Sequence, residues 1–399
     1  MVKFDLPRQV IYIIERIQRS GHRAHVVGGP VRDFLLGKTP HDYDITTDAL
    51  PEKIKEIFSE YRTVDTGIKH GTVTLVLDRE NYEITTYRVD GEYKDSRHPE
   101  SVFFTTRLED DLARRDFTMN AIAYNPEEGI TDPYGGEGDV REGIICAVGD
   151  PRKRFSEDAL RILRGIRFSA TLGFFLEYET YLAARELAPL LRNVSAERIY
   201  TEWYKLLGGK DAYRVLEESG DIISVFLPEL ADLRLPSFEL FGSASPIPRM
   251  LSLFYLAQGE SAPAAYKGAM TRLRTDARTR DMGTLALTCV GKFDTGAAVG
   301  INMLMADFGI EAARMTLETE ILLGIRNADS IHIITELIDS RAPYRAEDLD
   351  INGNDLIAIG YRGSEIGKEM RRLLSSVIRG ELSNSRAALL AEARKLPEN

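Results

Sequence analysis

Two aspartates separated by one residue are the first feature of the sequence that could carry chemistry. They are Asp42 and Asp44 in the segment "HDYDITT". In a strand, side chains two positions apart share one face, so both carboxylates would point the same way. Crowded carboxylates repel each other unless a cation lies between them, and an oxygen-rich pair suits Mg²⁺, which completes its shell with substrate phosphates. The pair therefore predicts a magnesium site that substrate phosphates complete.

A glycine-rich segment, "GGPVRD", lies shortly before this pair. Gly28 and Gly29 follow a short apolar run, as at the end of a strand, and residues without a side chain let backbone N–H groups approach a triphosphate. Arg32 adds a cationic fork that matches phosphate oxygens. An isolated Asp-x-Asp motif is more often part of a surface strand, but the two motifs together favour a catalytic site.

Two further segments could complete such a site. The segment "RRDFTMNA" would place Arg115, Asp116 and Asn120 where a ribose or phosphates are held, although its arginines could also form a solvated helix end. Glu83, in "YEITTYR", is the candidate for a third metal-binding carboxylate, and a plain surface-strand role for it stays open.

The segment "SEDALRILRGIR" predicts a helix capped by Ser156, on which Asp158 and Arg161 are neighbours at i and i+3. A carboxylate beside a guanidinium complements the amine donor and ring-nitrogen acceptor that cytosine and adenine share. Uracil and guanine present the reverse pattern. A wrong base would leave buried polar groups unpaired, at about 1–3 kcal/mol for each neutral group. The pair therefore predicts selection of C and A over U and G.

The same segment continues with two more arginines. Arg164 extends the series, whereas Arg167 would point to the opposite side of the helix from Asp158 and contact either primer RNA or an internal acid. An amphipathic helix laced with ordinary ion pairs is the alternative interpretation.

The composition is that of an ordinary globular protein. The 399 residues carry a net charge of −11, which argues against a nonspecific nucleic-acid coat but not against an enzyme with local basic clusters. Two cysteines show neither metal-ligand spacing nor a disulfide framework. No apolar run reaches the roughly 18 residues that cross a bilayer, and the charged N-terminal segment does not resemble a signal peptide. We therefore expect a cytoplasmic protein that does not bind membranes.

The pattern along the chain changes near Pro151. Before it, short β-rich runs alternate with turns and short helices, and after it almost every segment has helical periodicity. The polar segment Asp90–Thr106 is long enough to be a functional loop. The expected fold class is α+β, with a small mixed β-sheet and helices first and an all-helical remainder of two or three subdomains.

The four motifs, in this order, resemble a class II tRNA nucleotidyltransferase of the bacterial CCA-adding type, within the polymerase β nucleotidyltransferase superfamily. The resemblance extends over nearly the whole chain and includes the tail segment "DLDINGNDLIAIGYRGSEIGKEMRRLL". It implies a catalytic head (1–150), a base-recognising neck (151–210), a helical body (211–335) and a tRNA-binding tail (336–399). Family nucleotide-contact positions match the following residues: Gly29, Arg32, Arg115, Arg164 and Arg167.

The resemblance also implies a reaction. Two Mg²⁺ ions at Asp42 and Asp44 would promote template-independent transfer of C, C and A from CTP and ATP to the 3′ end of tRNA that lacks CCA. The Asp90–Thr106 loop would support the switch from C to A, and no stable protein partner is implied. An A-adding or CC-adding enzyme, a poly(A) polymerase, or a catalytically inactive RNA-binding protein are the alternatives.

Overall fold

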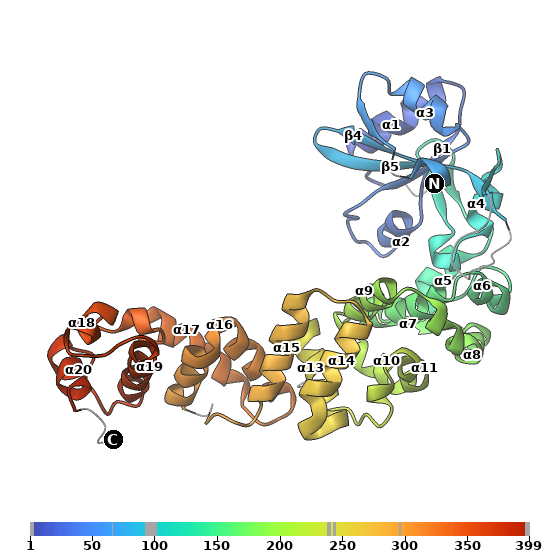
Figure 1. Ribbon diagram of the computed structural model, residues 1–399. Helices are drawn as coiled ribbons and strands as arrows, with labels where there is room; N and C mark the ends of the chain where they lie inside the picture. The colour runs from blue at the N-terminus through green and yellow to red at the C-terminus, as the bar shows by residue number, and fades with distance from the viewer. Residues whose placement is uncertain are drawn as a thin grey trace. The chain divides into compact units, whose positions relative to one another are not determined.

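The computed structural model describes residues 4–65, 67–91, 102–237, 241, 245–294 and 297–395. The chain forms two compact units, Met1–Phe226 and Leu227–Asn399 (Figure 1). The boundary between them falls inside the predicted body, 211–335, so the division into head, neck, body and tail stays a prediction. Within the predicted functional loop Asp90–Thr106, residues 92–101 lie outside the described residues.

A mixed sheet forms the centre of the first unit. Its strand order is β3-β4-β5-β2-β1-β8-β9. The strands are β1 (Ala24–Val27), β2 (Asp44–Thr47), β3 (Arg62–Val64), β4 (Thr72–Leu77), β5 (Glu80–Thr86), β8 (Ala123–Asn125) and β9 (Gly129–Thr131). β2 and β5 run parallel, and the other neighbouring strands run antiparallel. The α+β class is therefore confirmed, with a β-rich first part of the chain.

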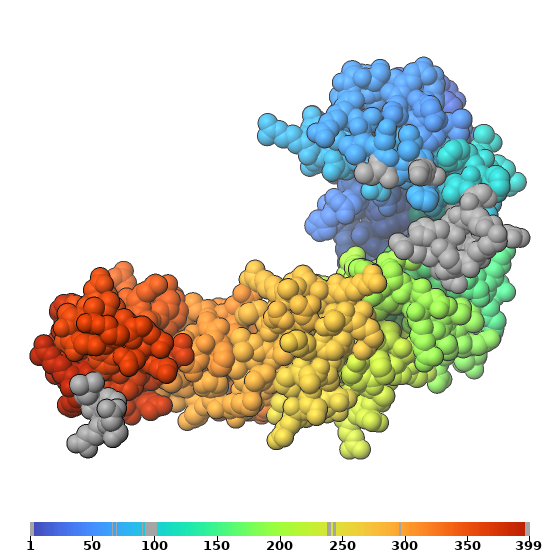
Figure 2. All heavy atoms as spheres, in the orientation of Figure 1, coloured from blue at the N-terminus to red at the C-terminus, as the bar shows by residue number. Residues whose placement is uncertain are grey.

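A tight turn joins β4 to β5. Asp78 and Arg79 both have positive φ, 52° and 69°, the conformation that lets a two-residue turn match the twist of the strands it connects. The hairpin tip projects from the side of the head in both the ribbon and the space-filling views (Figures 1 and 2).

Short helices cover the sheet and lead into it. α1 (Arg8–Arg19) buries Val10, Ile13, Ile14 and Ile17, which have the i, i+3, i+4, i+7 spacing of one helix face. The remaining helices of this part are α2 (Gly29–Leu35), α3 (Pro51–Ile57), α4 (Leu108–Ala113) and α5 (Gly136–Glu142), and a two-stranded ribbon pairs β6 (Arg88–Asp90) with β7 (Val102–Phe104).

Helices dominate the chain after Pro151, as expected. The first unit continues with α6 (Pro151–Glu157), α7 (Leu160–Leu172), α8 (Tyr178–Leu187), α9 (Ala196–Leu207), α10 (Ala212–Glu218) and α11 (Gly220–Phe226). The prediction that Ser156 caps a helix is wrong, because α6 begins earlier and Asp150 caps it by accepting the Arg152 N–H. A strand, β11 (Phe175–Leu176), also interrupts the helical run and pairs with β10 (Ile144–Ile145).

The second unit is helical. It contains α13 (Pro246–Gln258), α14 (Ala262–Arg272), α15 (Ala277–Cys289), α16 (Ala298–Leu322), α17 (His332–Asp339), α18 (Gly353–Ala358), α19 (Ser364–Ile378) and α20 (Arg386–Ala393). Among the described residues, no helix is both long and apolar enough to cross a membrane.

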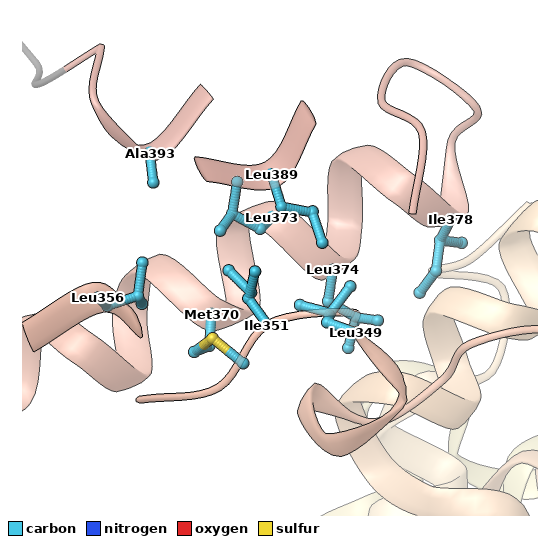
Figure 3. Packing of buried hydrophobic residues seen from close by; sticks show 9 residues of the cluster. All are labelled: Leu349, Ile351, Leu356, Met370, Leu373, Leu374, Ile378, Leu389 and Ala393. Carbon is cyan, nitrogen blue, oxygen red and sulfur yellow. The ribbon is translucent and has the colours of Figure 1, made fainter. Parts of the chain in front are cut away.

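Two apolar clusters hold this second unit together. The C-terminal cluster gathers nine buried residues around Leu373 and Leu389 (Figure 3), and a second cluster includes Leu304 and Leu317 of α16. α16 is interrupted at Gly309, where φ is 84° and ψ is 164°. Met303, which precedes this break, packs against the C-terminal cluster.

Candidate active site

The aspartate pair lies at the beginning of a central strand. Asp44 is the first residue of β2, and Asp42 precedes the strand in irregular backbone. The expectation that both aspartates belong to one strand is therefore wrong for Asp42. Asp44 pairs in register with Glu83 of the parallel strand β5, and adjacent strands are only about 4.8 Å apart.

The three carboxylates of this strand end influence one another electrostatically. Burial raises the pKa of Asp44, the Arg115 charge partly offsets this rise, and the Asp42 charge raises it further. The pKa of Glu83 is raised by burial and then by the charges of Asp44 and Asp42. Asp42, Asp44 and Glu83 therefore form one negatively charged cluster, in which a cation would relieve the repulsion.

The donor chemistry of this cluster fits a hard cation. Carboxylate oxygens are the ligands that Mg²⁺ prefers, and Mg²⁺ is normally held by one or two carboxylates plus substrate phosphates. Across the parts of the chain that the structure describes, no group of three His, Cys, Asp or Glu side chains converges tightly enough to hold a metal alone. The cluster thus suits an ion that arrives with a phosphate-bearing substrate.

A buried carboxylate ties this strand to the predicted arginine motif. Asp111 of α4 is fully buried and accepts hydrogen bonds from Arg114 Nη2 at 2.6 Å, Arg115 Nη2 at 3.4 Å and Thr46 Oγ1 at 3.3 Å. Burial opposes its ionisation, but the charges of Arg114 and Arg115 prevail and lower the pKa of Asp111. Sequence reasoning missed Asp111, although it lies only three residues before Arg114.

Arg115 is the more weakly held of the two arginines. Its guanidinium reaches Asp111 only at 3.4 Å, and its buried Nε has no hydrogen-bond partner among the described residues. It also contributes to the electrostatic environment of Asp44. Among the arginines predicted to contact the nucleotide, Arg115 is therefore the one whose charge acts on Asp44 of the carboxylate cluster.

The two glycines have different surroundings, and those of Gly28 differ from the expectation. Gly28, with φ 80° and ψ −126°, donates its N–H to the Ile122 carbonyl at 3.0 Å, so this N–H is committed within the protein. A Cβ on Gly28 would lie 3.0 Å from Arg115 Nη1. Gly29 is an ordinary first residue of α2, where a Cβ would meet Arg32 Nη2 at 3.8 Å. Gly28 therefore gives Arg115 room beside the strand end.

Replacement of Gly28 by alanine should destabilise the protein by about 1–3 kcal/mol, because alanine rarely adopts this backbone conformation. The added methyl group should also displace the Arg115 guanidinium and reduce activity further. Denaturant unfolding and steady-state rates would measure both effects. Gly29→Ala is the matched control and should change both quantities little; equal effects of the two substitutions would contradict this assignment.

A chain of hydrogen bonds connects Arg32 to α7. Arg32 Nη1 donates to Asn120 Oδ1 at 2.8 Å, Asn120 Nδ2 donates to Asp116 Oδ1 at 3.1 Å, and Arg164 Nε donates to Asp116 Oδ2 at 2.8 Å. Asp116 and Asn120 are buried. The prediction that they face a ribose or phosphates therefore changes: in this structure they orient Arg32 and Arg164.

Arg164 keeps Asp116 ionised. Burial opposes the charge of Asp116, but the Arg164 guanidinium and the Asn120 amide outweigh it and lower the pKa of Asp116 to about 2. Arg32 gains a further contact from its neighbour Asp33, which accepts from Arg32 Nη2 at 2.8 Å. These buried bonds fix both arginines before any substrate binds.

Arg167 lies beside an internal acid, one of the two roles expected for it. Its Nε donates to Glu202 Oε2 of α9 at 2.8 Å, and Arg164 Nη1 lies 4.0 Å from the same carboxylate. Arg164 and Arg167 are therefore on one face of α7, and because Asp158 lies outside this helix, the expected orientation of Arg167 opposite to Asp158 stays a prediction. Phe168 stacks under Arg167, with 3.5 Å from Cζ to the ring centroid, and Arg32 and Arg164 lie 5.3 and 5.4 Å from that centroid.

Asp158 and Arg161 do not share a helix, contrary to the prediction. Asp158 has φ −140° and ψ 102° and separates α6 from α7, whereas Arg161 lies in the first turn of α7. Arg161 donates from Nη1 to Glu157 Oε2 at 2.8 Å and from Nη2 to the Arg114 carbonyl at 2.9 Å. The side chain of Asp158 instead accepts from Arg198 Nη2 of α9 at 2.8 Å. Sequence reasoning missed Arg198.

Carboxylates at the start of a central strand, faced by arginines that buried acids hold in place, define a nucleotidyltransferase head followed by a helical part. A family model described as "Poly A polymerase head domain" matches residues 24–146, and one described as "Probable RNA and SrmB- binding site of polymerase A" matches residues 173–233. The chain is 35% identical over 399 residues to the CCA-adding enzyme of Leuconostoc mesenteroides, with 96% of both chains covered. The chain belongs to the family of CCA-adding enzymes.

Other relatives agree with this assignment. The CCA-adding enzyme of Lactococcus lactis is 36% identical over 400 residues, covering 96% of both proteins, and that of Geobacillus stearothermophilus is 48% identical over 227 residues, 56% of this chain and 55% of its own. The crystal structure of the Bacillus stearothermophilus CCA-adding enzyme in complex with CTP covers 98% of this chain and 97% of its own, with 31% identity and a TM-score of 0.80. The resemblance inferred from the sequence is confirmed.

Proposed function

We propose that this chain adds C, C and A to the 3′ end of tRNA, using CTP and ATP as substrates and no template. The observation that carries the proposal is the cluster of Asp42, Asp44 and Glu83 beside Arg115, on a chain similar along its whole length to CCA-adding enzymes. Because its substrate is tRNA, the protein acts in the cytoplasm, and the RNA contacts its helical part mainly through phosphates and shape.

Asp42 and Asp44 are the residues that would hold two Mg²⁺ ions, and Glu83 is the candidate third carboxylate. When bound, these ions supply charge neutralisation on the triphosphate and lower the pKa of the attacking 3′-hydroxyl. The pKa values of Asp44 and Glu83 are raised first by burial and then by the neighbouring carboxylates, and such a partly buried cluster of acids supports this assignment.

The reaction proceeds by in-line displacement. The 3′-hydroxyl oxygen of the tRNA loses its proton to solvent and bonds to the α-phosphorus, the bond from this phosphorus to the bridging oxygen breaks, and pyrophosphate leaves. Arg32, Arg115, Arg164 and Arg167 bind and orient the nucleotide, and Asp116 and Asn120 keep two of these arginines in place. Gly28 and Gly29 leave room at the edge of this nucleotide site.

Asp158 and Arg161 select the base. The Asp158 carboxylate accepts from the exocyclic amine of C or A, and Arg161 donates to the ring nitrogen. The hydrogen bonds of Arg161 to Glu157, Arg114 and the Arg154 carbonyl fix its guanidinium without exhausting its N–H donors. Uracil and guanine would face donor against donor and acceptor against acceptor.

Replacement of Asp158 by alanine should lower the preference for CTP over UTP, and for ATP over GTP, by about tenfold or more. Without the carboxylate, the acceptor of uracil or guanine no longer faces a second acceptor that it cannot pair with. The quantity to measure is the ratio of kcat/KM for CTP to that for UTP on one tRNA primer. An unchanged ratio would rule out base selection by Asp158.

The function itself is tested with labelled tRNA that ends at the discriminator base, Mg²⁺, and CTP alone, ATP alone or both. We expect two additions with CTP alone and three with both nucleotides. An arrest after two additions with both would indicate a CC-adding enzyme, and a long ladder with ATP alone a poly(A) polymerase. If no product forms with CTP, ATP or both, an inactive RNA-binding protein would be favoured.

A further inference from the structure

One face of α9 carries two charged residues that pair with the segment they pack against. Arg198 and Glu202 are one helical turn apart, so they lie on the same side of α9, and this helix packs along α7. Glu202 accepts from Arg167 at 2.8 Å, and Arg198 donates to Asp158 at 2.8 Å. α9 thus contacts both a predicted nucleotide-binding arginine, Arg167, and the predicted base-selecting residue Asp158.

The contact between Arg198 and Asp158 is two-pronged. Arg198 Nη2 lies 2.8 Å from Asp158 Oδ2 and Nη1 lies 3.4 Å from Oδ1, while the Leu160 N–H donates to Oδ1 at 3.1 Å. The side chains of Arg198 and Asp158 are 28% and 16% exposed, so the pair is only partly solvated. Three hydrogen bonds, two from Arg198 and one from the Leu160 N–H, therefore define the plane of the Asp158 carboxylate.

This support matters because of the backbone at Asp158. The residue lies between two helices in an extended conformation, so no helical neighbours at i−4 or i+4 restrict its side chain. A carboxylate that can rotate accepts hydrogen bonds from several directions, and it tolerates bases whose donors are misplaced. A planar guanidinium fork limits this freedom, which a single ammonium group does less well.

We propose that Arg198 is a positioning residue for base selection: it holds the Asp158 carboxylate in the orientation that accepts the amine of C or A. This inference rests on the proposed role of Asp158. Arg198 itself touches neither the base nor the reacting atoms.

The test compares Arg198→Ala, Arg198→Lys and Asp158→Ala. The readout is the ratio of kcat/KM for CTP to that for UTP, and for ATP to that for GTP, on the same tRNA primer. Partial unfolding lowers every kcat/KM by the same factor, so it leaves these ratios unchanged. We expect Arg198→Ala to lower both ratios by about tenfold and Arg198→Lys to lower them less.

A control and a double variant complete the experiment. Arg185→Ala removes another arginine–carboxylate pair of the first unit, Arg185–Asp221, and should leave the ratios unchanged. Arg198→Ala should add nothing to Asp158→Ala, because it acts through the carboxylate that is already gone. Should Arg198→Ala not fold, the lysine variant decides the matter.

The outcomes separate this inference from the proposed function. If Asp158→Ala lowers the ratios but neither Arg198 variant does, Arg198 is not a positioning residue. If Arg198→Ala lowers kcat/KM equally for all four nucleotides, its role is structural only, and the inference is also wrong. If Asp158→Ala leaves the ratios unchanged, base selection by Asp158 fails and the inference fails with it.

Discussion

Replacement of Asp44 by asparagine should lower nucleotide incorporation by about 10³-fold or more and leave the protein folded. Asp44 opens β2 at the centre of the carboxylate cluster, and an amide there is a weaker ligand that carries no charge. Loss of one metal-binding carboxylate costs several kcal/mol of transition-state stabilisation, and each factor of ten in rate corresponds to about 1.4 kcal/mol. Single-turnover incorporation of CMP into tRNA measures the effect.

The same substitution should slightly stabilise the folded protein when no metal is bound. Asp44 and Glu83 have raised pKa values, so their charges destabilise the folded state above those pKa values. Asp44→Asn removes one of these charges and should raise the melting temperature slightly in chelator. Mg²⁺ with CTP should then stabilise the unaltered protein more than the variant.

The matched control for this substitution is Asp78→Asn. Asp78 lies at the β4–β5 turn of the same unit, and the hydrogen bond described for its carboxylate comes from Gln9. This control should change neither rate nor the response to Mg²⁺. Full activity of Asp44→Asn would contradict the metal assignment.

Replacement of Asp116 by alanine should destabilise the first unit by about 3 kcal/mol. The substitution leaves Arg164 without its main counter-ion, and removal of one partner of a buried pair typically costs about 3–5 kcal/mol. Arg164 keeps 34% of its side chain exposed, which favours the lower end of that range. Urea unfolding followed by fluorescence suits the measurement, because Trp203, the single tryptophan, is fully buried in α9.

The effect of this substitution should depend on pH in a defined direction. The pKa of Asp116 falls from its ordinary value of 3.8 to about 2 in the folded protein. Between these values the unfolded chain binds more protons, so the stabilisation by Asp116 is fully present above pH 3.8 and is lost as the pH falls towards 2. The difference between Asp116→Ala and the unaltered protein should therefore shrink in that window.

Asp221→Ala serves as the control for this comparison, because Asp221 pairs with the half-exposed Arg185 and exposed pairs contribute about 1 kcal/mol or less. If Asp221→Ala lost as much stability at pH 7 as Asp116→Ala, burial of the ion pair would not explain the effect of Asp116→Ala.

The sequence predicted the parts of the site that are close together along the chain. The aspartate pair, the glycine-rich segment and the change to helices after Pro151 follow from local residue types and periodicity, and the α+β class follows from them. These features needed no knowledge of which segments meet in space.

The partners that hold the arginines could not be predicted in the same way. Glu202 lies 35 residues from Arg167, and Arg198 lies 40 residues from Asp158. The chain has 62 acidic residues, and charge pattern alone does not show which of them meets a given arginine. Such pairs depend on how α9 packs on α7.

The error at Asp158 has a local cause. The period of apolar residues in "SEDALRILRGIR" continues through Asp158, so a single helix was the simplest prediction. The structure ends α6 at Glu157 and begins α7 at Leu160, and Asp158 accepts the Leu160 N–H at the start of the second helix. Aspartate favours such positions, and this preference was the available signal.

The interruption of α16 at Gly309 has a mechanical consequence. A continuous helix of 25 residues would act as one stiff rod and transmit a rotation of one end to the other. The non-helical residue Gly309 divides this helix into two halves, so each half can rotate about its own axis independently of the other. The half before the break packs against both apolar clusters, through Met303 and Leu304, while the half after it orients Leu317 towards the second cluster independently.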